Sequence, residues 1–253
     1  MMRALGYAAL GTLFTFLMTT LGAATVFLLG GEESAGARSQ APMLGFAGGV
    51  MTAASVWSLL LPALEQAAGW ALPAWLPAAA GVGAGAGFLA ALDALLPRLR
   101  RVGGDARRRQ NAMLFAAITL HNIPEGMAVG LAFALAAGGE GLAGAAALAL
   151  GIGVQNFPEG AAISLPLRQM GEGRGRAFAA GTLSGAVEPL FGVLVVLAAA
   201  GVRALMPWLL SFAAGAMLYV VIEELVPQSN TRGGVCGFLA GFLVMMILDV
   251  ALG

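Results

Sequence analysis

The sequence predicts an all-α membrane protein with eight transmembrane helices. Of its 253 residues, 59% are hydrophobic and only 10% are charged, whereas a soluble domain carries about a quarter charged residues. A helix that crosses the bilayer needs about 20 apolar residues, so a chain of this length has room for eight spans joined by short loops. No length remains for a soluble domain, and we expect a single transmembrane domain.

Charge clusters and breaks rich in glycine and proline divide the chain into these eight segments. The apolar run from Ala4 to Leu29 is longer than a signal-peptide core of roughly 7 to 15 residues and lacks a convincing cleavage site. It is therefore predicted to be the first span. The predicted spans cover about 5–29, 42–64, 73–97, 111–136, 142–167, 176–200, 206–226 and 235–252.

Arginine sets the predicted orientation, because basic residues near span ends accumulate on the cytoplasmic side. Every one of the 13 basic residues is Arg. If both termini lie outside, only Arg3 and Arg203 remain on the outer side, so both termini are predicted to be extracytoplasmic. The Arg-rich stretch from Arg98 to Arg109 is interpreted as a solvated loop that helps to set this topology, rather than as an anionic-lipid site.

Charge and cysteine content exclude several classes of function. Thirteen acids balance thirteen bases, so the net charge gives no indication of a nucleic-acid partner. The single cysteine, Cys236, can form neither an intrachain disulfide nor a thiolate cage for structural zinc. The sequence has no ATP-binding loop, so transport would have to draw on ion gradients or on the membrane potential.

Two predicted spans carry the same polar motif. Span four contains His-Asn-Ile-Pro-Glu-Gly at 121–126, and span five contains Gln-Asn-Phe-Pro-Glu-Gly at 155–160. The match continues beyond the motif with small and apolar pairs, which indicates an internal duplication. Because consecutive spans run antiparallel, the two copies would form an inverted repeat, a common feature of transporters.

The spacing within each copy suits a divalent metal. Residues four apart share a helix face, so His121 can bind an ion together with Glu125, and Gln155 together with Glu159. His121 is about ten residues into its span, or about 15 Å at the helical rise, which places it near the bilayer centre. A site there would be reached equally well from both sides of the membrane.

The motif prolines and glycines have separate predicted roles. Each proline lacks an N–H and leaves a carbonyl one turn earlier, that of Leu120 or Val154, without its usual partner. Such a carbonyl is a candidate oxygen ligand. Gly126 and Gly160 would let another helix approach closely.

A third acid, Glu188, lies in the middle of span six, directly before a proline. Three buried carboxylates cannot all remain ionised without cations, so one or two divalent ions are expected between Glu188, Glu125 and Glu159. Protonation, as in a proton relay, is a compatible alternative because metal binding displaces protons. A purely structural network of hydrogen bonds between helices is the third interpretation. Four side chains would complete the coordination: His121, Asn122, Gln155 and Asn156.

The paired motif and the eight predicted spans resemble the ZIP (Zrt/Irt-like) family of metal transporters, and the span-five motif is similar to its GufA-like branch. The resemblance covers essentially the whole chain and implies a binuclear site for zinc or a similar ion, with Glu125 and Glu159 bridging the two ions. The ligands implied at one metal are His121, Glu125, Gln155 and Glu159. The residues implied at the second are Asn122, Asn156 and Glu188.

The resemblance also implies functional residues outside the motif. Met51 in span two has a thioether soft enough to contact zinc or cadmium, and a packing role is equally consistent with a methionine there. Glu65 corresponds to an acid at the entrance. Glu223 and Glu224 correspond to a station near the inner end of span seven.

The chain departs from the family pattern in its loop and in its second metal position. Arginines replace the His-rich sequence that many relatives carry between spans three and four, which argues against metal sensing by that loop. Asn156 stands where some relatives have Asp, which makes the second metal position less negative. Asp93 and Asp249 are interpreted as interfacial or packing residues.

The function implied by the resemblance is import of zinc, or of cadmium, iron or manganese, toward the cytoplasm, without enzymatic activity. An elevator-type motion is implied, in which spans one, four, five and six slide against a wall of spans two, three, seven and eight. A homodimer surrounded by lipid in a bacterial inner membrane is the expected setting.

Two other functions compete with this one. A selective metal channel stays open, because the same site could lie in a continuous pore. An intramembrane metallohydrolase is disfavoured, because its metal usually needs three protein ligands, often with paired histidines, and His121 is the single His of the chain.

Overall fold

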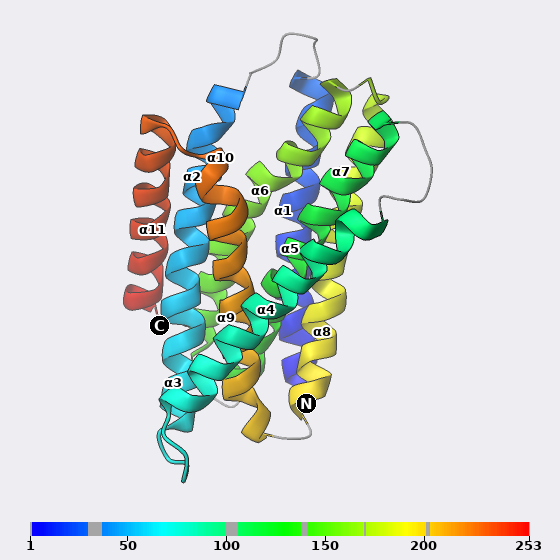
Figure 1. Ribbon diagram of the computed structural model, residues 1–253. Coiled ribbons are helices and arrows are strands. Elements are labelled where there is room, and N and C mark those ends of the chain that lie inside the picture. Colours follow the sequence, from blue (N-terminus) through cyan, green and yellow to red (C-terminus); the bar gives the residue numbers. More distant parts are fainter. Residues whose placement is uncertain are drawn as a thin grey trace.

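The structure is a computed structural model that forms a bundle of helices (Figure 1). It describes residues 2–29, 37–99, 106–137, 141–169, 171–200 and 203–252, and no strand occurs among these residues. The predicted all-α class is therefore confirmed for the described part of the chain.

Along the chain the helices form long rods, and some of these rods consist of two or more consecutive helical segments of different type. Before the paired motif these are α1 (Met2–Leu29), α2 (Ala37–Ala54) with the π-helical segment η1 (Ser55–Leu60) and α3 (Leu61–Ala67), and α4 (Trp75–Leu99). The two motif helices are α5 (Ala106–Ala136) and α6 (Leu142–Gln169). After them come α7 (Arg174–Gly185), α8 (Val187–Ala200), the short η2 (Arg203–Leu205), α9 (Met206–Val220), the π-helical η3 (Val221–Leu225), α10 (Val226–Gln228) and α11 (Arg232–Leu252).

Six stretches of the described residues are long and apolar enough to cross a membrane, by length and composition. They are Met2–Leu28, Ala41–Ala67, Trp75–Leu95, Arg174–Ala198, Met206–Gln228 and Arg232–Ala251. Helices α5 and α6, which carry the polar motif, are not among them, although each is one continuous helix. The eight-span prediction is thus confirmed for six spans, and membrane crossing by α5 and α6 stays a prediction.

Packing divides the helices into two groups. We call α1, α5, α6, α7 and α8 the site bundle, because α1 packs along α6 and α5 along α8, with α1 contacting all four other members. We call the remaining helices the wall bundle, in which α2 packs along α11 and α4 along α9. The bundles meet where α5 contacts α9 and where α6 contacts α2 and α11. This division is the one that the elevator hypothesis requires.

The motif glycines lie at close helix contacts of the site bundle. A Cβ on Gly126 would overlap the backbone of Glu188 on α8, and a Cβ on Gly160 would overlap the carbonyl oxygen of Thr19 on α1. A larger residue at either position would separate the helices. The predicted role of these glycines in close approach is therefore confirmed.

The two ends of the chain lie in the same half of the bundle. The N and C markers both fall in the lower half of Figure 1, where α3 also lies. An even number of long helical columns produces this arrangement. Which side of the membrane that half faces stays a prediction from the arginine distribution.

Candidate metal centre

The polar residues of the paired motif are buried inside the site bundle. His121 and Glu159 are 6% and 7% exposed. The fully buried members of the group are Asn122, Glu125, Gln155, Asn156 and Glu188. Burying so many polar groups costs free energy unless hydrogen bonds or ions satisfy them, so their partners determine what the site can do.

Two amide side chains of α6 connect the three motif-bearing helices. The Nε2 group of Gln155 donates a hydrogen bond to Oε1 of Glu125 over 2.8 Å. The Nδ2 group of Asn156 donates to Oε2 of Glu188 over 2.9 Å. Helix α6 is therefore linked to α5 by one amide and to α8 by the next. The Glu125 carboxylate also interacts electrostatically with those of Glu159 and Glu188, so the three acids form one cluster.

Several buried oxygens of this cluster accept no hydrogen bond from the described residues. They are Asn122 Oδ1, Glu125 Oε2, Gln155 Oε1, Asn156 Oδ1 and Glu159 Oε2. A buried acceptor without a partner costs about 1 to 3 kcal/mol. A divalent cation bound by several of these oxygens would satisfy them together.

The carboxylates and the imidazole alone do not form a closed cage. Among the described residues, no three His, Cys, Asp or Glu side chains are placed closely enough to surround one ion. A metal held here would therefore need amide oxygens as well as carboxylates. Asn122, Gln155 and Asn156 are the amide side chains with a free buried oxygen.

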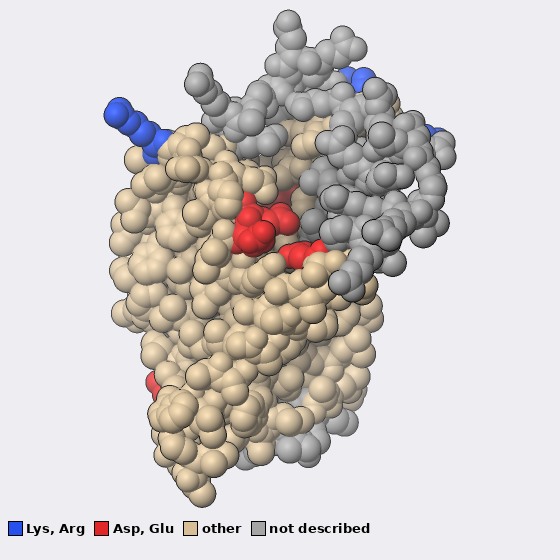
Figure 2. Space-filling model, viewed as in Figure 1, with Lys and Arg blue, Asp and Glu red and all other residues tan. Residues whose placement is uncertain are grey.

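His121 contacts an acid of the wall bundle. Its Nε2 atom is 3.6 Å from Oε1 of Glu224, whose side chain is 27% exposed. Glu224 lies in η3 beside the exposed Glu223, and it interacts electrostatically with both Glu223 and Asp93. Figure 2 shows acidic atoms gathered in a hollow in the upper half of this face. The interpretation of Asp93 as a packing residue is incomplete, because the structure joins it to this acidic group.

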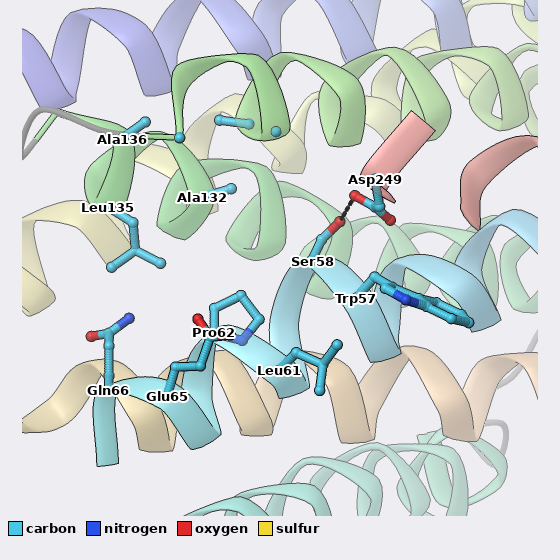
Figure 3. Close-up of a pocket in the computed structure, with 13 residues that line it drawn as sticks. Trp57, Ser58, Leu61, Pro62, Glu65, Gln66, Ala132, Leu135, Ala136 and Asp249 are labelled. Carbon is cyan, nitrogen blue, oxygen red and sulfur yellow. Dashed lines mark hydrogen bonds between the residues drawn. The ribbon is translucent and has the colours of Figure 1, made fainter. Parts of the chain in front are cut away.

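A second polar region lies at the opposite end, around a cavity of about 540 Å³. Glu65 and Gln66 of α3 and Ser58 of η1 line it, together with Asp249 of α11 (Figure 3). The Ser58 hydroxyl donates to Oδ1 of Asp249 over 2.6 Å, while the buried Oδ2 has no hydrogen-bond partner in the described part of the chain. Asp249, interpreted from the sequence as a packing or interfacial residue, therefore shares a cavity with the predicted entrance acid Glu65.

Met51 is fully buried in the apolar core. Its backbone carbonyl accepts the hydroxyl of Ser55 one turn later. These contacts are consistent with the packing role, one of the two roles considered for Met51 from the sequence. Its role as a soft metal ligand stays a prediction.

Sequence analysis assigned no ligand or pathway residue to α1, yet α1 contributes directly to the acid cluster. The Thr19 hydroxyl donates to Oε1 of Glu188 over 3.1 Å, and Nδ2 of Asn156 lies 3.4 Å from the carbonyl oxygen of Thr15. The available signal was the recurrence of threonine at 12, 15 and 19, which places three hydroxyls on one helix face.

Fold and site together define a polytopic membrane protein with an internal cluster of carboxylate and amide groups, an arrangement typical of ion pathways. The chain belongs to the ZIP family: a family model described as ZIP Zinc transporter matches residues 102–249. This confirms the resemblance seen in the paired motif. Members of this family are transporters, so the prediction that the chain is not an enzyme is also confirmed.

Individual relatives extend the similarity over nearly the whole chain. Zinc transporter ZIPB of Bordetella bronchiseptica is 40% identical, with 98% of this chain and 82% of the relative covered. Zinc transporter GufA of Myxococcus xanthus is 37% identical over 98% of this chain and 100% of its own. Zinc transporter ZIP11 of Homo sapiens is 36% identical over 97% of both chains.

Proposed function

We propose that the chain carries divalent metal ions, zinc above all, across a membrane toward the cytoplasm through a site between α5, α6 and α8. Membership of the zinc transporter family supports the cargo. The observation that carries the proposal is the set of buried motif oxygens without hydrogen-bond partners beside three mutually interacting carboxylates. Cadmium, iron and manganese are further candidate cargoes, because the same oxygen and nitrogen ligands bind them.

The amide groups are already oriented in a way that suits an ion. Gln155 and Asn156 each donate through nitrogen to a glutamate and keep the amide oxygen free. An ion between the acids could therefore take these oxygens without breaking the existing hydrogen bonds. One ion would bind His121, Glu125, Gln155 and Glu159. A second would bind Asn122, Asn156 and Glu188, with Glu125 and Glu159 shared between the two.

Acids at both ends of the bundle support a route through this site. At the lower end, Glu65 and Asp249 line the cavity of Figure 3 and would attract cations at the entrance. At the upper end, Glu224 contacts His121, so an ion released by this imidazole would meet Glu224 and then the exposed Glu223. We assign the lower end to the extracytoplasmic side, because the arginine distribution predicts both termini there.

An elevator-type motion is supported by where these residues lie. All the candidate ligands of the motif belong to α5, α6 or α8 in the site bundle, whereas Glu65, Asp93, Glu223, Glu224 and Asp249 belong to the wall bundle. The whole ion site could thus move as a unit past stationary acids. A channel remains the alternative function, and it would conduct without relative movement of the bundles.

A homodimer is supported by the outer face of α4. Gly81 and Gly85 pack against α9, while a Cβ on Gly83 or Gly87 would meet no described atom within 4 Å. Small residues at four-residue spacing let helices of a membrane protein pack closely, and α4 belongs to the wall bundle. We propose that two copies pair through this wall, in a bacterial inner membrane.

Zinc uptake by reconstituted protein tests the proposed function. We expect proteoliposomes containing the wild type to accumulate radioactive zinc, and those containing Glu125→Ala to lose at least tenfold in rate. Glu172→Ala is the matched control, because this acid lies between α6 and α7, outside the motif, where it pairs with Arg176. Equal uptake by wild type and Glu125→Ala would refute the mechanism. Steady zinc currents, rather than saturable uptake, would indicate the channel.

A further inference from the structure

Helix α1 contributes a row of hydroxyls to the acid cluster. Thr12, Thr15 and Thr19 are all fully buried, and their spacing of three and four residues places them on one helix face. That face contacts α6 and α8, where Asn156 and Glu188 lie. Buried helix hydroxyls usually return a hydrogen bond to their own backbone, and those of Thr12 and Thr15 do so. The Thr19 hydroxyl lies 3.3 Å from the carbonyl oxygen of Thr15 but closer, at 3.1 Å, to Oε1 of Glu188 on α8.

Glu188 differs from the other two acids in how its oxygens are occupied. Its Oε1 accepts the Thr19 hydroxyl at 3.1 Å and its Oε2 accepts the Asn156 amide at 2.9 Å. Glu125 and Glu159 each have one oxygen with no hydrogen bond from the described residues. Glu188 is therefore fixed at both oxygens, from α1 on one side and from α6 on the other.

The position of Thr19 is itself set by two glycines. The carbonyl of Thr19 occupies the space that a Cβ on Gly160 would need. A Cβ on Gly185 would lie 3.0 Å from the Cβ and Cγ2 of Thr19 and 3.1 Å from Oε1 of Glu188. Helices α1, α6 and α7 are thus in contact at the level of the Thr19–Glu188 hydrogen bond, which leaves the hydroxyl little freedom to move.

We propose that Thr19 is a positioning residue for the second ion. Its hydroxyl holds Oε1 of Glu188, so that Oε2 would keep a lone pair for the ion beside the hydrogen bond that it accepts from the Asn156 amide. The free Oδ1 of Asn156 would bind the same ion without breaking that hydrogen bond. Thr19 itself does not contact the metal. The inference rests on the proposed function, because it assigns Glu188 to the second metal position.

Outer partners of this kind orient metal ligands, and their loss typically weakens metal affinity about 10- to 100-fold. The proposal therefore concerns affinity for one of two ions. Binding of the first ion should be unaffected, because none of the described hydrogen bonds joins Thr19 to the ligands proposed for the first metal.

Zinc binding to the purified full-length chain, followed by calorimetry, tests the proposal with three variants. Thr19→Val keeps the shape of the side chain and removes the hydroxyl, Thr19→Ala removes it without a second methyl group, and Thr19→Ser retains it. For the wild type we expect two binding events. For Thr19→Val and Thr19→Ala we expect the weaker event to lose about 10- to 100-fold in affinity and the tighter event to change less than twofold. Thr19→Ser should restore both.

Uptake by proteoliposomes gives an independent measurement. Thr19→Val should raise the KM for zinc and leave the maximal rate within about twofold, because saturating zinc refills the weakened position. Size-exclusion profiles of all variants report folding. A Thr19→Ser variant as impaired as Thr19→Val would indicate a packing role and overturn the proposal.

Other outcomes separate this inference from the proposed function. If Glu125→Gln abolishes zinc binding and both hydroxyl-deleted variants bind zinc as the wild type does, the role of Thr19 is refuted and the transport site stands. If Glu125→Gln also binds normally, the proposed site itself is wrong. A wild type that binds a single ion would remove the second position and overturn the inference.

Discussion

The Asn156→Asp substitution tests the second metal position, because it should have opposite effects on the stability of the protein without zinc and with zinc. The change replaces an N–H donor by a carboxylate oxygen at the place where Nδ2 now lies 2.9 Å from Oε2 of Glu188. Without metal, we expect the variant to be less stable than the wild type. With zinc, the added anionic ligand should make the bound state more stable.

The magnitude follows from the same geometry. Two unit charges at 2.9 Å repel by about 6 kcal/mol at an effective dielectric constant of about 20, and uptake of one proton by the pair relieves most of this repulsion. The shared proton lets the two carboxyl groups hydrogen-bond to each other, so the remaining cost is that of taking up the proton, about 1.4 kcal/mol for each unit by which the pH exceeds the pKa of the pair. For zinc, we expect affinity at the weaker site to rise at least tenfold, which adds about 1.4 kcal/mol of stabilisation.

Thermal unfolding of the detergent-solubilised chain, with a chelator and then with saturating zinc, measures both effects. Asn230→Asp is the matched control, because Asn230 is an exposed residue in the turn before α11, so it adds the same charge away from the cluster. The reasoning is refuted if Asn156→Asp changes the unfolding temperature equally in both conditions. It is also refuted if Asn230→Asp gives the same pattern.

Two further predictions concern the route and the movement. Ser58→Ala removes the donor that orients Asp249 in the lower cavity, so the KM for zinc should rise severalfold with little change in maximal uptake rate; a fall in maximal rate alone would argue against an entrance role. A Cβ on Gly151 of α6 would overlap the sulfur of Met245 on α11, whose flexible side chain must move aside, and would lie 3.5 Å from Cγ1 of Val50 on α2. Cysteines at these two positions, in a Cys236→Ser background, should form a disulfide that stops uptake until it is reduced. Undiminished uptake by the cross-linked protein would favour a channel.

The sequence predicted the burial of the paired polar motif well because its signal is local. Acids, amides and prolines in apolar helices are costly, so their repetition at 121–126 and 155–160 identified residues that are buried in the structure. The glycines that follow were expected to allow close helix contact, and they lie against Glu188 and Thr19. Each of these predictions needs only helix periodicity and the cost of burying polar groups.

The contacts that the sequence did not predict join residues far apart in the chain. Thr19 and Glu188, Ser58 and Asp249, and His121 and Glu224 belong to different helices, and pairing them requires knowledge of which helices pack together. Helix type also mattered, because Ser58 and Glu224 lie in π-helical segments. A regular α-helical register assigns such side chains to the wrong face.

The amide groups would let the proposed site exist both with and without an ion. A carrier must cross the membrane loaded and return empty, and an empty cluster of three carboxylates would repel itself. In the structure Gln155 and Asn156 donate to Glu125 and Glu188, so two of the acids are stabilised without a metal.

These amides do not block the loaded state, because their oxygens remain free. Replacing them with acids would tighten the binding of an ion and destabilise the empty form, while replacing them with apolar residues would remove ligands and leave carboxylates unpaired. Amides therefore lower the free-energy difference between empty and loaded states. We infer that this balance, rather than the highest affinity for zinc, is what transport requires of positions 155 and 156.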